Sequence, residues 1–511
     1  MNVGRVASCR HRPYSAVPMP RRRNKPKTAA SSNTDIIPHS TSTRPDPTSE
    51  RERLCKLASK ALASSGKAVA ALLLAERSAF EQYAPGTLAQ LRLSRDKFEQ
   101  PDSSAETEAK EDAAQLVQQL AIHSGDVSRC SIRIGDQLTL TTPVWTVAPM
   151  VGQCDLPFRL LTRRHGARLV YSEMLMADEF VASAKYRQIG LGLGSGPLPE
   201  GDHPLIVQFA VNDPAILLRA AVIAQNECGA DAVDINLGCP QNRAREGHYG
   251  SFLHDPCDWD LVCSMVRVCA TSSALHIPVT CKIRLQPTVE STIEFCKRLE
   301  AAGAALIAVH GRQRGDEKHR RSGAADLEAI REIKSALRIP VLSNGNVSSY
   351  ADAIRALHIT GCDGVMSAEE ILRDPALFER CERCLEQLVT HDDDQKEASE
   401  GGHASAHEAS ADMANPDVVG LASEYVSLCE LHPPSSVWTV GSRDEEGPGE
   451  VAKQHLTRML RFQHGARDVL SEHAFLTARS VTQIAKAFRA GSGLRRDPHL
   501  VPLEAGLQMV S

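Results

Sequence analysis

Aromatic side chains, long apolar runs and regularly spaced cysteines are all scarce in this sequence of 511 residues. Phe, Trp and Tyr make up only 4 % of the chain, which is low for an aromatic-rich binding surface. The longest uninterrupted apolar run, residues 68–75, is far shorter than the roughly 20 residues that a membrane helix needs. We therefore expect no integral membrane protein and no membrane partner.

The cysteines are numerous but irregularly placed. Fifteen are present with no repeated spacing, and several lie inside apolar segments, which is typical of reduced, buried thiols rather than a disulfide framework. Cys381 and Cys384 form a CxxC pair without a second pair or a histidine pattern, so we expect no metal site. The cysteines in apolar segments are Cys228, Cys263, Cys269, Cys281 and Cys362.

The net charge is −5, so any contact with nucleic acid must come from a local basic surface. The first 34 residues contain no Asp or Glu but carry eight Arg and Lys. A disordered tail, an organelle transit peptide, a nuclear signal and a basic arm for nucleic acid all fit this composition. We expect a cytoplasmic or nuclear protein, or both, with organelle targeting by the basic N-terminus as the alternative.

The middle of the chain alternates short apolar runs with segments of helical periodicity. Such alternation indicates a parallel sheet with right-handed crossovers, and eight units in about 235 residues fit a TIM (β/α)8 barrel, an α/β fold. A doubly wound open sheet is the alternative, but it usually shows a glycine-rich turn after its first strand, where this chain has APMVGQCD. The eight runs are 144–150, 169–175, 204–211, 232–237, 278–285, 306–310, 340–343 and 364–366.

The flanking regions differ in composition from this barrel. Residues 50–120 are rich in Ala, Leu and Gln with an amphipathic pattern, whereas residues 391–417 are polar and without a hydrophobic period. The predicted organisation is a disordered basic tail (1–50), a helical extension (51–140), the barrel (141–385), a low-complexity linker (386–417), a smaller helical domain (418–497) and a tail (498–511).

Polar residues follow the eight apolar runs, and in a TIM barrel these positions form one mouth. They suit a phosphate-bearing aromatic cofactor, because backbone N–H groups after the seventh and eighth strands are the usual phosphate site. Lys282 would place a cation near a reduced flavin ring, His310 would bond a ring carbonyl, and Gln208 would bond the polar edge of the ring.

Cys239 lies between Gly238 and Pro240, just beyond the end of the fourth strand. A lone cysteine is usually a small buried hydrophobic residue, but this position exposes the thiol to a bound substrate. We favour a general acid, which needs only to deliver a proton at the right place. A nucleophile activated by a nearby base such as His248 is the alternative.

These motifs resemble the tRNA-dihydrouridine synthase family over nearly the whole barrel. RRHGA, GHYG and GVMSAE are similar to the eukaryotic branch that acts on D-loop positions 16 and 17. The carrying stretches are VAPMVGQCDLPFRLLTRRHGA (147–167), QFAVNDP (208–214), DINLGCPQNRAREGHYGSFL (234–253), VTCKIRL (279–285), VHGR (309–312), SGAADLEAI (322–330), PVLSNGN (340–346) and GVMSAEEILRDPALF (364–378).

The resemblance implies an FMN-dependent oxidoreductase that reduces uridine in tRNA with NADPH or NADH. Hydride would pass from the reduced flavin to C6 of an extruded uracil, and Cys239 would protonate C5. Asn236 and Arg284 would contact substrate or cofactor, and Arg312 would contact substrate. The residues that the resemblance assigns to FMN are Pro149, Met150, Val151, Gln208, Lys282, His310, Asn344, Gly345, Asn346, Ala368 and Glu369.

The family carries a helical tRNA-binding domain after the barrel, and residues 418–490 are the candidate. Residues 451–497 hold nine Lys and Arg against three Asp and Glu, and we expect Arg458, Arg461 and Lys486 to contact tRNA phosphates. We also expect a monomer. Two alternatives stay open: an FMN barrel enzyme acting on a free pyrimidine or dihydroorotate, and a catalytically inactive tRNA-binding homologue.

Overall fold

The computed structural model describes residues 56–57, 130–194, 196–315, 323–386, 417–438, 447–461, 475, 478 and 480–492. The chain divides into two compact units, and apart from residues 56–57 all described residues belong to the unit that contains 124–511. The predicted tails (1–50 and 498–511) and nearly all of the predicted linker lie outside the described residues. No helix in the described ranges is long and apolar enough to cross a membrane.

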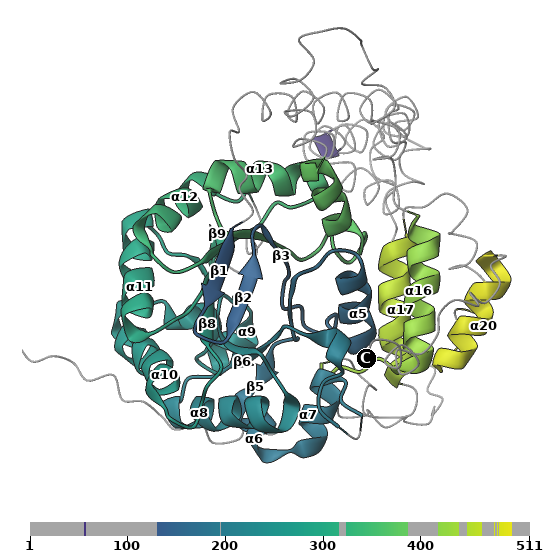
Figure 1. The fold of residues 1–511 in the computed structure, drawn as a ribbon, viewed down its shortest axis with the longest axis horizontal. Helices are drawn as coiled ribbons and strands as arrows, with labels where there is room; N and C mark the ends of the chain where they lie inside the picture. The colour runs from purple at the N-terminus through teal and green to yellow at the C-terminus, as the bar shows by residue number, and fades with distance from the viewer. Residues whose placement is uncertain are drawn as a thin grey trace, which may run out of the picture. The chain divides into compact units, whose positions relative to one another are not determined.

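Eight parallel strands form a closed barrel, seen end-on in Figure 1. The ring closes because β4 pairs with both β3 and β6, which confirms the TIM-barrel prediction. Each of the eight predicted runs holds a strand, and the second run is split into β4 and β5 by residues 172–174. The strands are β3 (Val144–Val147), β4 (Leu169–Tyr171) with β5 (Leu175–Met176), β6 (Leu205–Ala210), β7 (Ala232–Leu237), β8 (Val279–Leu285), β9 (Ile307–Gln313), β10 (Val341–Asn344) and β11 (Gly364–Ser367).

Amphipathic helices cover the outside of the barrel. In α11 the side chain of Thr288 accepts a hydrogen bond from the N–H of Ser291, and Gly303 ends the helix in the left-handed conformation. The helix buries one stripe against the sheet, as its 3.6-residue period predicts. The covering helices are α5 (Leu156–Arg164), α6 (Ala177–Ala182), α7 (Ala184–Leu191), α8 (Pro214–Ile223), α10 (Trp259–Thr271), α11 (Val289–Ala302), α12 (Leu327–Ala336) and α13 (Tyr350–Thr360).

An antiparallel hairpin of β1 (Ser131–Ile134) and β2 (Leu138–Thr141) precedes the barrel. Ile134 is fully buried in a cluster with residues near the starts of the barrel strands, such as Val144 and Leu306. The prediction of a helical extension over 51–140 is therefore wrong for residues 131–140. The alternating pattern of IRI and LTLT around a Gly-Asp turn is a strand signal that outweighs the helical composition upstream.

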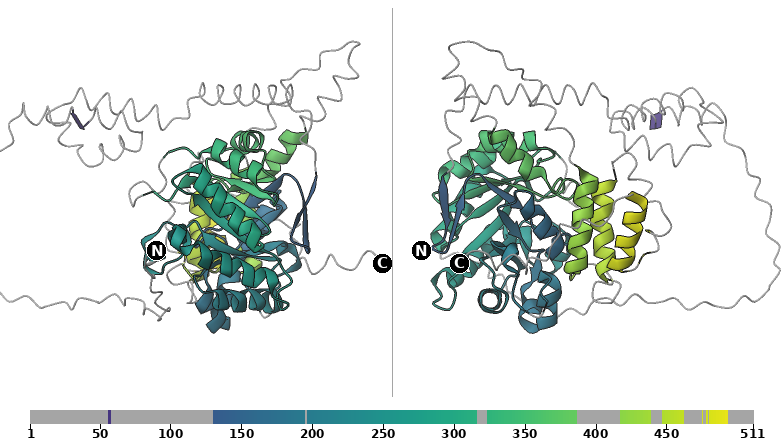
Figure 2. Two further views of the ribbon diagram at one scale, coloured as in Figure 1. Left: turned by 90° about the vertical axis from the view of Figure 1, so that its left-hand side faces the viewer. Right: turned by 45° about the vertical axis from the view of Figure 1, so that its right-hand side comes forward.

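After the barrel the structure describes three helices (Figure 2): α16 (Val418–Leu431) and α17 (Gly447–Leu460) pack beside α5, and α20 (Val481–Ser492) packs on α16 and α17. Asp155 caps α5 and also accepts a hydrogen bond from Tyr425 on α16 at 3.3 Å. Its other carboxylate oxygen lies 2.6 Å from Nε2 of His455 on α17, with both side chains fully buried. The His455 ring stacks on Phe158 of α5, with ring centroids 4.4 Å apart. The helices and the barrel therefore share one buried junction.

Candidate functional site

A series of buried hydrogen bonds connects the interior of the barrel to the loop that carries Cys239. Thr280 donates to Asp234 (2.7 Å), and the Gln208 amide donates to the other oxygen of Asp234 (2.8 Å). Asn236 donates to the Gln208 carbonyl oxygen (2.8 Å), and the Asn236 oxygen accepts from the backbone N–H of Cys239 (2.9 Å). Because Asp234 accepts at one end, every amide in the series has a fixed orientation.

Burial raises the pKa of Asp234 to about 7, against the hydrogen bonds from Gln208 and Thr280 and the charge of Lys282, which lower it. Gln208 is itself fully buried, and both ends of its amide are already bonded. The structure thus gives Gln208 a supporting role beneath Asn236. The predicted contact between Gln208 and the cofactor edge stays a prediction.

Cys239 is half-buried in the loop between β7 and α9 (Asn242–Glu246). Gly250 lies against it with a φ of +66°, and a Cβ there would approach the Cys239 carbonyl oxygen at 2.7 Å. Arg284 supports the loop from β8, donating to the Gly238 carbonyl at 2.8 Å. Asn236 and Arg284, predicted as substrate or cofactor contacts, both lie at this loop. His248, the alternative base, faces Asp258 at 3.1 Å.

Lys282 and Asn344 join β8 and β10, the two strands that flank β9. Nζ of Lys282 donates to the Asn344 side-chain oxygen at 3.0 Å, and the Asn344 amide donates to the Met366 carbonyl at 2.8 Å. Burial, reinforced by nearby Arg284, lowers the pKa of Lys282 to about 8. The lysine therefore stays mostly protonated at neutral pH and presents a fixed cation inside the mouth.

The ends of β9 and β10 form a second polar group. Arg312 contacts His310 Nε2 at 3.1 Å and also bonds the side chain of Asn346. Gly345 has a φ of +122°, and a Cβ there would approach Ala325 at 2.8 Å and the His310 ring at 3.1 Å. Only glycine fits such a position, because the backbone conformation is left-handed and Ala325 and His310 fill the space that a Cβ would need. Arg312 thus lies with the predicted phosphate loop.

The first and eighth strands complete the rim. Pro149 and Met150 are half-buried, and Val151 is 45 % exposed, one of two large apolar side chains so exposed among the described residues. Ala368 is half-buried and Glu369 is exposed after β11. The cation of Lys282 suits an anionic flavin ring, and the exposed side chain of Val151 suits its apolar face. The loop of Gly345 and Asn346 beside Arg312 suits a phosphate group. The residues present therefore fit FMN.

The predicted tRNA contacts lie outside the mouth. Arg458 and Arg461 are exposed at the end of α17, and Lys486 is exposed on α20. Arg489, counted in the basic excess, instead pairs with Glu430 on α16 through both of its terminal nitrogens, at 3.0 and 2.6 Å. Part of the basic composition thus holds the helices together.

Sequence reasoning missed several supports. Asp234 is two residues before Asn236 on the same strand face, and a carboxylate within an apolar strand is a signal that could have found it. Arg314 was missed as well. It donates to the Ser251 carbonyl at 3.1 Å, while the Ser251 hydroxyl donates to the Cys239 carbonyl at 3.0 Å. No local pattern announces a contact between loops so far apart in sequence.

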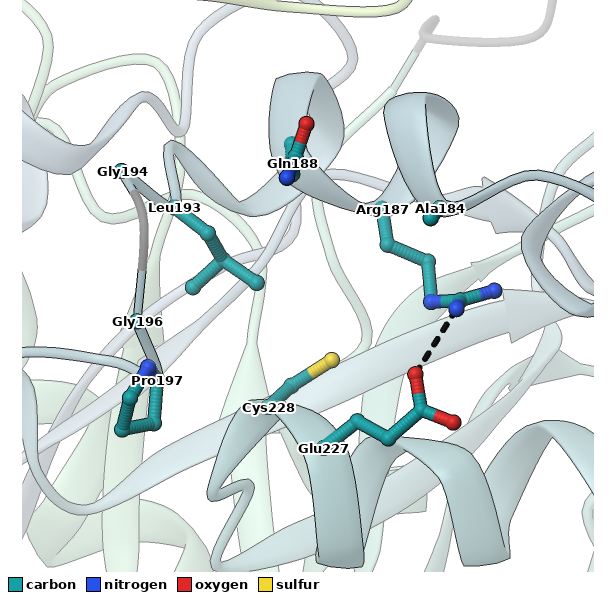
Figure 3. Close-up of a pocket in the computed structure, with 9 residues that line it drawn as sticks. All are labelled: Ala184, Arg187, Gln188, Leu193, Gly194, Gly196, Pro197, Glu227 and Cys228. Carbon is teal, nitrogen blue, oxygen red and sulfur yellow. Dashed lines mark hydrogen bonds and ion pairs between the residues drawn. The ribbon is translucent and has the colours of Figure 1, made fainter.

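A hollow of about 340 Å³ lies elsewhere, between α7 and the turn after α8 (Figure 3). An ion pair between Arg187 and Glu227 (2.7 Å) lies in its wall. The Cys228 thiol is beside it, and burial raises the pKa of that thiol to about 11. None of the predicted site residues lines this hollow.

The closed barrel with polar residues at its mouth places the chain among the proteins with the TIM-barrel fold. The sequence model of the family described as "Dihydrouridine synthase (Dus)" matches residues 146–466, more than half of the chain. The chain belongs to this family. The match covers the barrel strands, the mouth and the first two helices that follow the barrel.

Curated relatives carry the same family name. A mouse protein named "tRNA-dihydrouridine(16/17) synthase [NAD(P)(+)]-like" is 47 % identical over 233 residues, covering 46 % of this chain and 47 % of that protein. Two proteins named "tRNA-dihydrouridine(16/17) synthase [NAD(P)(+)]" are 43 % identical in Schizosaccharomyces pombe and 41 % in Saccharomyces cerevisiae. These alignments cover 46 % of this chain and 57 % and 54 % of those proteins. The chain thus spans about half the length of the relatives that it matches.

Among solved structures, 6-hydroxypseudooxynicotine amine oxidase from Pseudomonas geniculata N1 aligns with a TM-score of 0.38 and 15 % identity. The alignment covers 50 % of this chain and 49 % of that one, and the likeness is too distant to inform function.

Proposed function

We propose that this chain reduces uridine to 5,6-dihydrouridine in the D-loop of tRNA, with FMN as cofactor and NAD(P)H as reductant. The observation that carries the proposal is the position of Cys239, held by Asn236 at the mouth where Lys282 presents its cation. Family membership supports the reaction class, and the names of the relatives support tRNA and NAD(P)H.

The cofactor would lie across the mouth. Lys282, Asn344 and His310 would hold its ring, and Gly345 with Asn346 would take its phosphate beside Arg312. The rim residues Pro149, Met150, Val151, Ala368 and Glu369 would enclose it. When bound, FMN supplies the hydride that reduces C6 of the uracil.

The protein's own contribution is to hold a proton donor. The loop that carries Cys239 is bonded from three directions, by Asn236, Arg284 and Ser251. A donor held in this way loses little orientational freedom when it delivers a proton to C5. The uracil must leave its stack to reach the mouth, so the substrate would bind with an extruded base.

Product formation by the purified chain tests this proposal. The chain would be supplied with FMN, NADPH and tRNA from a strain that lacks the modification, and the product would be located by mass spectrometry. Dihydrouridine at position 16 or 17 is expected. A flavin that is reduced by NADPH without any tRNA product would favour the alternative, an FMN barrel enzyme acting on a free pyrimidine.

Cys239→Ala tests the role of the thiol. The variant should keep bound flavin and NADPH oxidation but form product more slowly by about a hundredfold or more, the usual contribution of a positioned acid. Cys130→Ala is the matched control, because Cys130 is an exposed thiol beside the β1–β2 hairpin. Equal product formation by the two variants would refute the general-acid role.

A further inference from the structure

Residues 435–438, which we call the strap, lie between the described ends of α16 and α17 and contact the residues that follow β4 at the rim of the barrel. The Ser435 hydroxyl donates to the Ile189 carbonyl near the end of α7, at 2.7 Å. The Trp438 indole N–H donates at 2.6 Å to the carbonyl of Met174, which follows the end of β4. The strap is therefore tied to the barrel at both of its ends.

A buried carboxylate links the middle of the strap to the rim. Glu173 accepts hydrogen bonds from the Ser436 hydroxyl (2.6 Å) and the Val437 N–H (2.9 Å). The same carboxylate accepts from the N–H of Gly152 at 2.9 Å. Gly152 directly follows Val151, so the strap and the loop after β3 share one side chain. Burial raises the pKa of Glu173 to about 7, against these three donors.

The strap also reaches the cysteine loop. The Arg243 guanidinium lies over the Trp438 ring, 4.3 Å from its centre. Arg243 is exposed on α9, the short helix that follows Cys239 in the same loop. The strap is thus linked through Glu173 to the loop after β3, and through Arg243 to the loop that carries Cys239.

We propose that Arg243 and Trp438 are positioning residues, through which the strap holds the Cys239 loop in register with the loop after β3. The inference rests on the proposed function for its catalytic consequence, but the position of the loop can be measured without it. A proton donor must be held within hydrogen-bond reach of its target, so a displaced loop lowers turnover more than it lowers binding.

Thiol reactivity tests the loop position without cofactor or tRNA. Iodoacetamide labelling of Cys239 would be followed by peptide mass spectrometry in the wild type and in Arg243→Ala. We expect the labelling rate to change by about 2- to 30-fold, the range that a cation–π contact supports. Arg298→Ala is the matched control, because Arg298 lies 5.0 Å from the ring centre of Trp259 on the outside of the barrel, and should leave the rate unchanged.

Turnover gives the second measurement. Arg243→Ala should lower kcat for tRNA, while the Kd for tRNA and NADPH oxidation without tRNA stay within about twofold. Trp438→Leu should act in the same way, and the double variant should lose no more than either single variant. Arg243→Ala decides the question if Trp438→Leu does not fold, because Arg243 is exposed.

The outcomes separate the two proposals. A changed labelling rate in a protein that makes no dihydrouridine would support the positioning role of Arg243 and Trp438 and overturn the proposed function. An unchanged labelling rate together with an unchanged kcat would overturn the positioning role of Arg243 and Trp438. A loss of tRNA affinity equal to the loss of activity, with unchanged labelling, would also overturn it, because the pair would then contact tRNA directly.

Discussion

Gly345 combines an unusual backbone conformation with close neighbours. Alanine there would be strained at a φ of +122° and would push into Ala325 and the His310 ring. We expect Gly345→Ala to weaken FMN binding by about tenfold or more, because the phosphate loop must shift. Flavin fluorescence quenching measures this affinity. Gly361→Ala is the control, since Gly361 has a φ of +59° with open space around it, and it should lose stability alone. Equal flavin affinity in both variants would contradict the role of the Gly345 loop in holding the phosphate of FMN.

Asp234 makes stability depend on pH. Its pKa rises from an ordinary value of 3.8 to about 7 because the folded state buries it, so the folded chain holds a proton that the unfolded chain has released. This stabilisation is fully present below pH 4 and is lost as pH rises through 7. Between pH 5 and 8 the wild type should lose on the order of 2–3 kcal/mol of unfolding free energy relative to Asp234→Asn.

Denaturant unfolding at several pH values measures this difference. Thr280→Val is the companion variant, because it removes a donor to Asp234 and leaves the carboxyl in place. It should move the loss of stability to higher pH without abolishing it. A constant difference between wild type and Asp234→Asn across this range would show that Asp234 does not titrate in the folded state.

Residue identities near strand ends were predictable, while their bonding was not. Asn344 ends a barrel strand and Cys239 lies in the loop just beyond one, whereas Lys282 is a polar residue inside the apolar strand β8. The contact between Gln208 and the cofactor stays a prediction, and the hydrogen bond from its amide to the carboxylate of Asp234 was not predicted. Single-sequence patterns give the side of a strand on which a residue lies, and bonding between strands depends on register.

The β1–β2 hairpin covers the end of the barrel at which the strands begin. Ile134 is fully buried there, whereas Ile132 on the same strand is half-buried. Ile134→Ala should lower the free energy of unfolding by about 2–5 kcal/mol, through lost burial and the cavity left behind. Ile132→Ala should cost clearly less. Equal losses in chemical denaturation would mean that the hairpin does not close the core.

Strands were the easier elements to predict. All eight barrel runs were found because fully buried parallel strands form continuous apolar segments between turns. The hairpin was missed because its short, half-exposed strands follow a long Ala- and Leu-rich stretch, and the helical prediction was extended too far. Within a window of only a few residues, the two-residue alternation of residues 131–141 distinguishes these strands from the helical pattern upstream.

At the scale of the molecule, the barrel and the following helices are joined by contacts that no local pattern encodes. Tyr425 and Asp155 are 270 residues apart in sequence, yet the hydroxyl bonds the carboxylate that caps α5. The sequence marked residues 418–497 as helical and basic, and the structure describes three helices there. What composition could not show is that Arg489 serves the packing of those helices.

The basic surface left for tRNA is therefore narrower than the composition suggests. Neutralising Arg458, Arg461 and Lys486 to Gln should weaken tRNA binding and lower the slope of log K against log salt by about 2–3, because each lost phosphate contact removes roughly 0.7–0.9. The control neutralises Lys297 on α11, Arg331 on α12 and Arg338 in the turn after α12, which are all exposed on the outside of the barrel. Affinities measured at several salt concentrations would decide. An equal decrease in slope for both sets would mean that tRNA is attracted by the charge of the whole molecule and not by the helices after the barrel.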